Sequence, residues 1–276
     1  MKIGFNEATA LKSSTLEQDL LLTEKFGYDY IEIRLDMLAD YLKKHTIDDL
    51  VEFFKNSHVK PYAINAIEPI NFFEGYGLEK LKNSVRYACE VAQKINNPYI
   101  VVVPTIGNTV DVYSEEEIED DSIRILNILA DIGDEYGVKM AFEPIGSSRC
   151  SVKTIKQSWQ IVKKVNRDSV GLVIDAFNLF LYDKLSSIED IRQVDLEKIF
   201  VVHIDDSLDL PLEQLDHCHR TWPGDGVIPL KKMIEELQKL GYQEIVSVEL
   251  FNPEIWKMTP EEIIKTGYEK VKNIIL

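Results

Sequence analysis

Three carboxylates and one imidazole interrupt four apolar segments in the second half of the chain. The four residues are Glu143, Asp175, His203 and Glu249. Three oxygen donors and one nitrogen donor suit a divalent cation such as Mn²⁺, Zn²⁺, Co²⁺ or Mg²⁺. Without a cation, carboxylates gathered in a partly dry site would repel one another. The pattern therefore predicts one divalent metal site; the alternative interpretation is solvated or salt-bridged carboxylates and a core histidine.

These four residues can meet only if the segments that carry them are neighbouring strands. Short apolar or β-branched segments alternate with longer amphipathic ones along the whole chain. Strands are expected at Lys2–Asn6, Tyr28–Arg34, Lys60–Asn65, Tyr99–Pro104, Lys139–Glu143, Val170–Asp175, Ile199–Asp205 and Glu244–Leu250. Strict alternation of strand and helix indicates a parallel sheet, because parallel neighbours need a helical crossover.

Eight such units predict a single α/β domain over residues 1–276, a (β/α)₈ TIM barrel. A doubly wound open sheet is the alternative, but its G-x-G-x-x-G phosphate-binding turn is absent from the sequence. In a barrel the polar residues at the C-terminal strand ends face one mouth. The four candidate ligands lie at equivalent places in strands five to eight.

Helix-capping signals support the alternation. Expected starts are Ser14 with Glu17, Thr46, Ser114 with Glu117, Thr154 with Gln157, Pro229, and Thr259-Pro260 with Glu262. Gly27, Gly137 and Gly241 are expected helix stops. Between the third and fourth strands we expect an irregular stretch, Glu68–Gly77, before a helix over Leu78–Ile95.

Further polar residues near the same strand ends are candidates for substrate binding. Asp205 shares the face of His203, and Glu32 and Asn6 follow the same logic in the first two strands, where ordinary buried pairing is the alternative. In the long loop after strand seven, Arg220 could hold hydroxyls and Trp222 could cover a ring face. The nearby pair His217 and His219 is interpreted as part of a solvated loop.

Composition excludes several classes of partner. The chain has 276 residues with 31 Lys and Arg against 47 Asp and Glu, which gives a net charge of −16. Such an excess of acid repels nucleic acid, so a small neutral substrate is expected. Three dispersed cysteines and the polar start of the chain predict a cytoplasmic protein, and no apolar run is long enough for a membrane span.

The motifs resemble the xylose isomerase-like sugar isomerase and epimerase barrels, and more closely the inosose (2-keto-myo-inositol) isomerases of inositol breakdown. The resemblance covers essentially the whole chain. It is carried chiefly by His203-Ile204-Asp205-Asp206, Trp222-Pro223-Gly224 and Val246-Ser247-Val248-Glu249-Leu250-Phe251. It implies one metal ion held by Glu143, Asp175, His203 and Glu249, with the two glutamates acting as acid and base.

The implied reaction moves a carbonyl between adjacent carbons of a ketoinositol or related ketose through an enediolate. A ketose 3-epimerase or a sugar dehydratase could use the same scaffold, and a sugar-binding barrel without turnover is the non-enzyme alternative. One position departs from the family pattern: Asn178 stands where a histidine often contacts the substrate. An amide can bond a hydroxyl but cannot shuttle a proton.

Overall fold

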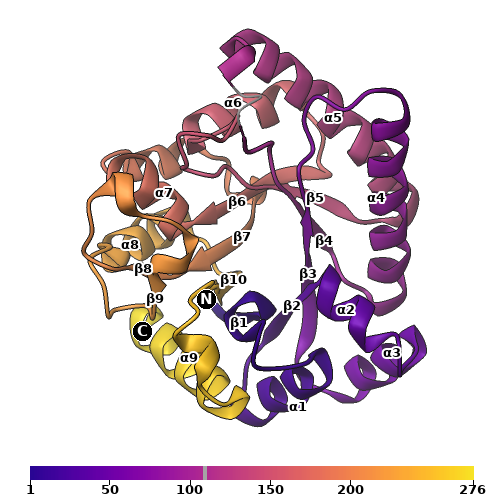
Figure 1. The fold of residues 1–276 in the computed structure, drawn as a ribbon, viewed down its shortest axis with the longest axis vertical. Coiled ribbons are helices and arrows are strands. Elements are labelled where there is room, and N and C mark those ends of the chain that lie inside the picture. Colours follow the sequence, from indigo (N-terminus) through magenta and orange to yellow (C-terminus); the bar gives the residue numbers. More distant parts are fainter. Residues whose placement is uncertain (108–110) are drawn as a thin grey trace.

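The computed structural model describes residues 1–107 and 111–276, which form a closed barrel of eight parallel strands surrounded by helices (Figure 1). The barrel order is β1-β10-β7-β6-β5-β4-β3-β2. The strands are β1 (Lys2–Asn6), β2 (Tyr30–Arg34), β3 (Lys60–Ile67), β4 (Tyr99–Val102), β5 (Lys139–Phe142), β6 (Val170–Asp175), β7 (Ile199–Ile204) and β10 (Ile245–Val248). The predicted (β/α)₈ barrel is confirmed.

Helices follow the strands and form the outer layer of the barrel (Figure 1). The α-helices are α1 (Leu16–Phe26), α2 (Leu35–Tyr41), α3 (Ile47–Asn56), α4 (Gly75–Ile95), α5 (Glu115–Tyr136), α6 (Ile155–Val165), α7 (Ala176–Asp183), α8 (Leu230–Leu240) and α9 (Pro260–Ile275). Short 3₁₀ helices include η1 (Glu7–Ala10) after β1 and η6 (His217–His219) after β7.

Most predicted helix starts are confirmed by side-chain capping bonds. Thr46, Ser114 and Thr259 form complete capping boxes, and Thr154 accepts a bond from the backbone N–H of Gln157. The prediction for α1 is wrong by one residue. Thr15, not Ser14, is the cap, because Leu16 is the first helical residue and the Thr15 side chain accepts from the Gln18 N–H.

Several boundaries differ from the predicted ones. β2 begins at Tyr30 rather than Tyr28, β3 continues to Ile67, and α4 begins at Gly75, three residues before the predicted start. The loop after β7 also contains an antiparallel pair, β8 (Asp206–Ser207) and β9 (Arg220–Thr221), which the sequence did not predict. This pair folds the loop after β7 back on itself.

Apolar side chains fill two regions. One cluster lies inside the barrel and includes Val101, Val173 and Val201; a larger one lies between the strands and the helices. The strand middles are thus apolar, and polar groups are concentrated at the strand ends. Over the described part of the chain, none of the helices has the length and apolar composition needed to cross a membrane.

Candidate metal centre

The four predicted ligands converge at the C-terminal ends of β5, β6, β7 and β10. One ligand atom each from Glu143, Asp175, His203 and Glu249 lies within 4.8 Å of all the others, and all four residues are buried. Nδ1 of His203 lies 3.3 Å from Glu249 Oε2, 3.5 Å from Glu143 Oε1 and 3.7 Å from Asp175 Oδ2. The imidazole therefore presents one nitrogen to three carboxylates.

The opposite nitrogen of His203 is held by a buried carboxylate. Nε2 lies 3.1 Å from Oε2 of Glu32, and that oxygen also accepts a bond of 2.9 Å from Asn65 Nδ2. Burial alone lowers the pKa of His203, but Glu249 and Glu32 outweigh it and raise this pKa well above its ordinary value. Glu32 thereby fixes the orientation of the ring toward the three carboxylates.

The cluster meets the requirements of a cation site. Nδ1 of His203 is buried and has no hydrogen-bond partner among the described residues, and Oδ2 of Asp175 has no hydrogen bond there beyond its ion pair with Arg220. Buried polar atoms are normally paired, so unpaired atoms of this kind need a ligand. Carboxylate oxygens with one imidazole nitrogen are suitable donors for a divalent metal, and the residues present therefore fit one.

Arg220 closes one side of the cluster. Its Nη1 lies 2.7 Å from Glu249 Oε2, 2.8 Å from Asp205 Oδ2 and 3.2 Å from Asp175 Oδ2. Its guanidinium carbon lies 5.2 Å from the ring centre of Phe177 and 5.3 Å from that of Phe251. Burial disfavours the charge, but the surrounding carboxylates raise the pKa of Arg220 and keep it ionised.

The β8 and β9 pair puts Arg220 in this position. Ser207 in β8 is paired with Arg220 in β9, and the side chain of Asp206 accepts bonds from the backbone N–H groups of Gly224 and Ile228. A Cβ on Gly226 would lie 2.3 Å from the Ser207 carbonyl oxygen, so only glycine permits this close return of the loop.

The two candidate acid–base glutamates have different surroundings. Burial raises the pKa of Glu143 to about 7. Burial also acts to raise the pKa of Glu249, but His203 and Arg220 outweigh it and lower this pKa to about 2. Glu143 Oε1 accepts a bond of 3.1 Å from Asn178 Nδ2, and Glu249 Oε1 accepts one of 2.9 Å from Asn6 Nδ2. An amide thus orients each glutamate.

Close packing fixes the contact between Asn178 and Glu143. A Cβ on Gly146 would lie 1.9 Å from the backbone oxygen of Asn178, so the loop after β5 approaches α7 as only glycine allows. Asn178 N–H also donates to Asp175 Oδ1 at 2.6 Å, which caps α7 with a candidate ligand.

A cavity of about 260 Å³ opens beside the cluster. It is lined by Arg34, Asn65, Ala66, Glu68, Val103, Ile106, Glu143, Ile145, Asn178, His217, Arg220, Glu249 and Phe251. Of the predicted substrate-binding residues, Asn178 and Arg220 line it. A small molecule in this space would meet one apolar ring and several polar groups, as in typical ligand pockets.

The other four predicted substrate-binding residues lie outside this lining. Glu32, Asn6 and Asp205 are fully buried and hold His203, Glu249 and Arg220 respectively. Trp222 belongs to the hydrophobic core, where its ring packs near Gly267 of α9. Its flat apolar ring is used for packing between the loop and α9.

Sequence reasoning missed several lining residues, among them Phe251, Glu68 and His217. Phe251 alternates with Glu249 along the chain, and this two-residue spacing could have indicated its direction. Glu68 was expected only as part of an irregular stretch. The interpretation of His217 as part of a solvated loop is wrong, because its ring lines the cavity and packs against Phe177 and Phe251.

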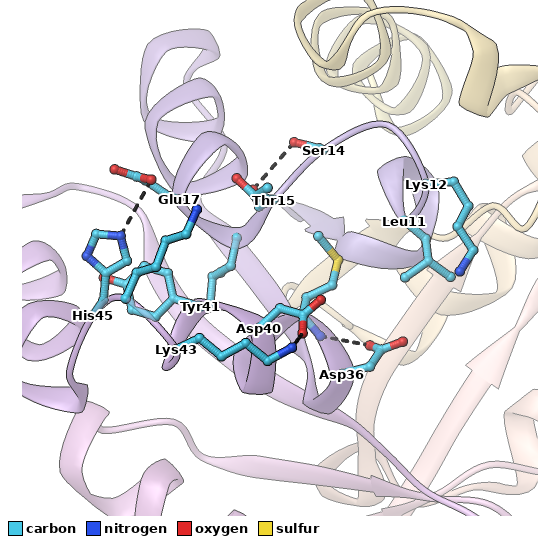
Figure 2. A pocket seen from close by; sticks show the side chains of 13 residues that line it. Leu11, Lys12, Ser14, Thr15, Glu17, Asp36, Asp40, Tyr41, Lys43 and His45 are labelled. Carbon is cyan, nitrogen blue, oxygen red and sulfur yellow. Dashed lines mark hydrogen bonds and ion pairs between the residues drawn. The ribbon is translucent and has the colours of Figure 1, made fainter.

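A second hollow lies outside the barrel mouth, between the Leu11–Glu17 segment and α2 (Figure 2). Its charged groups largely pair with one another: Lys43 with Asp40, and His45 with Glu17. It shares no lining residue with the cavity beside the metal-ligand cluster. The chemistry predicted from the sequence therefore belongs to the cavity at the strand ends.

Fold and site together define a TIM-barrel protein with a candidate metal centre at the C-terminal mouth. Residues 20–274 match the model of the family described as "Xylose isomerase-like TIM barrel". The chain therefore belongs to the xylose isomerase-like TIM barrel family.

Individual proteins give more specific similarities than the family model does. The chain is 42% identical to the inosose isomerase of Bacillus velezensis and 42% identical to that of Bacillus subtilis. Both alignments include all 276 residues of this chain, and they cover 97% of the first relative and 98% of the second. A crystal structure of an IolI protein with a bound zinc atom matches all of this chain and 98% of its own, with 42% identity and a TM-score of 0.96.

Proposed function

We propose that the protein is a metal-dependent inosose isomerase, which moves a carbonyl between adjacent carbons of 2-keto-myo-inositol or a related ketose. The observation that carries this proposal is the convergence of Glu143, Asp175, His203 and Glu249 beside a cavity of small-molecule size. The full-length likeness to inosose isomerases supports the choice of substrate class.

One divalent ion would be held by these four residues, with zinc the first ion to test because a zinc atom is bound in the related IolI structure. When bound, such an ion supplies Lewis-acid stabilisation for negative charge on substrate oxygens. His203 Nδ1, which has no hydrogen-bond partner among the described residues, supports this assignment. Mn²⁺, Co²⁺ and Mg²⁺ also suit this mostly oxygen donor set.

Glu143 and Glu249 are the proposed proton-transfer residues. Carbonyl transposition removes a proton from a hydroxyl-bearing carbon and returns one to the neighbouring carbon. Each glutamate lines the cavity and keeps one carboxylate oxygen bonded to an amide, from Asn178 and Asn6 respectively. In this scheme one glutamate removes the proton and the other returns one.

Arg220 and Asn178 are the proposed substrate-binding residues among the original candidates. Both present N–H donors at the cavity wall, which suits the hydroxyl and carbonyl oxygens of a neutral polyol. Phe251 offers an apolar face beside them. We propose instead that Glu32 positions His203, that Asn6 positions Glu249, and that Asp205 positions Arg220.

The test is incubation of zinc-loaded protein with 2-keto-myo-inositol in deuterated water, followed by NMR, with bound metal measured separately. We expect a ketoinositol isomer and deuterium at the carbon next to the carbonyl. Glu249→Gln should abolish both, whereas Glu213→Gln, at an exposed site, should not. Metal-loaded protein that gives neither isomer nor deuterium exchange would overturn the assignment.

The same incubation separates the alternatives. A dehydratase would form a conjugated enone that absorbs in the ultraviolet. A 3-epimerase would return a stereoisomer of a ketose with the carbonyl unmoved. A binding protein would bind the ketose in calorimetry without turnover across a ketose panel.

A further inference from the structure

The cavity contains one imidazole that the metal-ligand cluster does not use. His217 lies in η6, in the loop after β7, and its ring forms part of the cavity wall with Arg220, Glu249 and Phe251. Neither the acid–base scheme nor the metal site needs it. Its hydrogen bonds therefore decide what it can offer to a bound molecule.

The backbone of His217 is fixed by the residue before it. Oδ1 of Asp216 accepts the His217 N–H at 2.7 Å, and the Asp216 N–H donates to Nδ1 of His219 at 3.0 Å. The ring then packs at 86° against Phe251, with centroids 5.8 Å apart, and lies 6.1 Å from Phe177. The imidazole is held as a fixed part of the wall.

The contact with Arg220 determines the tautomer. Nη2 of Arg220 lies 3.4 Å from Nδ1 of His217. A guanidinium has donors only, so Nδ1 must be the acceptor and the proton of a neutral ring must sit on Nε2. Among the described residues Nε2 has no hydrogen-bond partner. Because His217 lines the cavity, its ring brings to the wall an N–H donor that no described residue binds.

The ring is neutral in this environment. Burial, reinforced by the positive charge of Arg220, lowers the pKa of His217 to about 4. A neutral imidazole N–H suits an uncharged hydroxyl or carbonyl oxygen. It adds no charge to a cavity whose wall already contains Arg34, Arg220, Glu143 and Glu249.

We propose that His217 is a specificity-determining residue whose Nε2–H donates a hydrogen bond to one hydroxyl oxygen of the cyclic polyol in the cavity. This inference rests on the proposed function for the substrate class. Arg220 has two roles in this arrangement, since its guanidinium contacts both the carboxylate cluster and Nδ1 of His217. The metal-ligand side and the substrate side of the cavity are thereby held in one arrangement.

Two isosteric variants separate this role from a purely structural one. In His217→Asn the side-chain oxygen can take the place of Nδ1 and keep the Arg220 contact, but the donor at the Nε2 position is lost. In His217→Gln the terminal amide can replace the Nε2 donor, while the Nδ1 acceptor is lost. His219→Asn is the matched control in the same turn, since His219 does not line the cavity and asparagine can keep the acceptor that binds the Asp216 N–H.

The experiment measures KM and kcat for 2-keto-myo-inositol on metal-loaded enzyme, and binding of non-reacting myo-inositol by calorimetry. We expect His217→Asn to raise KM and weaken binding about three- to tenfold, the range of one neutral hydrogen bond, with kcat little changed. His217→Gln should restore most of the loss. Of the monodeoxy inositols, the one lacking the contacted hydroxyl should bind both variants and the wild type equally.

Three results would overturn the proposal. His217→Asn could match the wild type, His217→Gln could be the more damaged variant, or every monodeoxy inositol could lose affinity equally. The last two would show that His217 only supports Arg220. Wild-type protein that binds myo-inositol without turning over the ketose refutes the proposed function, and the binding comparison still decides the role of His217. A wild type that binds neither compound refutes both.

Discussion

Glu32 and His203 form a fully buried pair in which Oε2 of the carboxylate lies 3.1 Å from Nε2 of the ring. The other ring nitrogen, Nδ1, faces the three candidate ligand carboxylates. A carboxylate behind a ligand imidazole fixes its tautomer and increases its basicity. The metal affinity of the site should therefore depend on a residue that does not touch the metal.

Glu32→Gln should weaken zinc binding about tenfold, because the amide keeps the shape of the side chain but removes its charge. Competition with a chromophoric chelator measures this affinity. Glu244→Gln, at the exposed position just before β10, is the control and should bind zinc as the wild type does. Equal affinities for all three proteins would show that Glu32 does not act on the metal through His203.

Removal of metal should lower the melting temperature. The ion binds the folded state and also relieves repulsion among Glu143, Asp175 and Glu249, so its loss costs about 4 kcal/mol when free metal stands at about 1,000 times Kd. For a chain of this size that corresponds to roughly 10 °C. Calorimetric scans before and after chelation measure the shift, and Asp175→Asn should shift much less. Superimposable wild-type scans would contradict the metal site.

The strand-end residues could be predicted because their position depends on a simple repeat. In a parallel barrel all C-terminal strand ends meet at one rim, so a single polar residue in each apolar strand, such as Asp175 or His203, identifies the site. The helices were predictable for the same reason, since caps such as Ser114 are local signals. The error at Ser14 arose because three hydroxyl residues, Ser13, Ser14 and Thr15, precede Leu16 and only the helix register selects Thr15.

Apart from Arg220, which was a candidate and lines the cavity, the loop residues could not be predicted in this way. His217 reaches the cavity because β8 and β9 pair, and because the Asp206 side chain accepts bonds from the backbone N–H groups of Gly224 and Ile228. These two residues lie 18 and 22 positions after Asp206 in the sequence. Trp222 packs on α9 near Gly267, which lies 45 positions further along the chain. Such contacts depend on the assembled barrel, so neither periodicity nor spacing in the loop itself indicates them.

Arg220 should be a major source of stability as well as a substrate contact. It is buried, and its Nη1 lies within 3.2 Å of carboxylate oxygens of Asp175, Asp205 and Glu249. Removing one partner of a buried ion pair leaves an uncompensated charge and costs about 3–5 kcal/mol. Arg220→Met should therefore lower the free energy of unfolding of metal-free protein by about that amount, as measured in urea at pH 7.

Asp205→Asn should partly restore the stability lost in Arg220→Met, because it removes the charge of one of the carboxylates that Arg220→Met leaves without a partner. The free energy of unfolding of the double variant should exceed the value expected from adding the two single-variant changes by about 1 kcal/mol or more. Asp209→Asn, at an exposed position of the same loop, supplies the control and should add nothing. Strict additivity of Arg220→Met and Asp205→Asn would show that the two residues do not interact energetically.

A buried carboxyl pair away from the site, Glu7 and Asp19, should make stability depend on pH. Both oxygens of Asp19 are buried, and neither has a hydrogen-bond partner in the part of the chain that the structure describes. Burial raises its pKa from 3.8 to about 7, and burial together with the charge of Asp19 raises the pKa of Glu7 well above its ordinary value. Both groups therefore hold protons more tightly in the folded protein than in the unfolded chain.

The sign follows from this difference. The folded state binds more protons between pH 3.8 and about 7, so the contribution of Asp19 to stability falls as pH rises through that window. Asp19→Asn removes the penalty, which amounts to about 4 kcal/mol above pH 7 and vanishes below about pH 4. Urea unfolding of metal-free wild type and Asp19→Asn at pH 4 and pH 8 measures it, with Asp209→Asn as the control. If the difference in unfolding free energy between Asp19→Asn and wild type were the same at pH 4 and pH 8, Asp19 would not be held protonated by the fold.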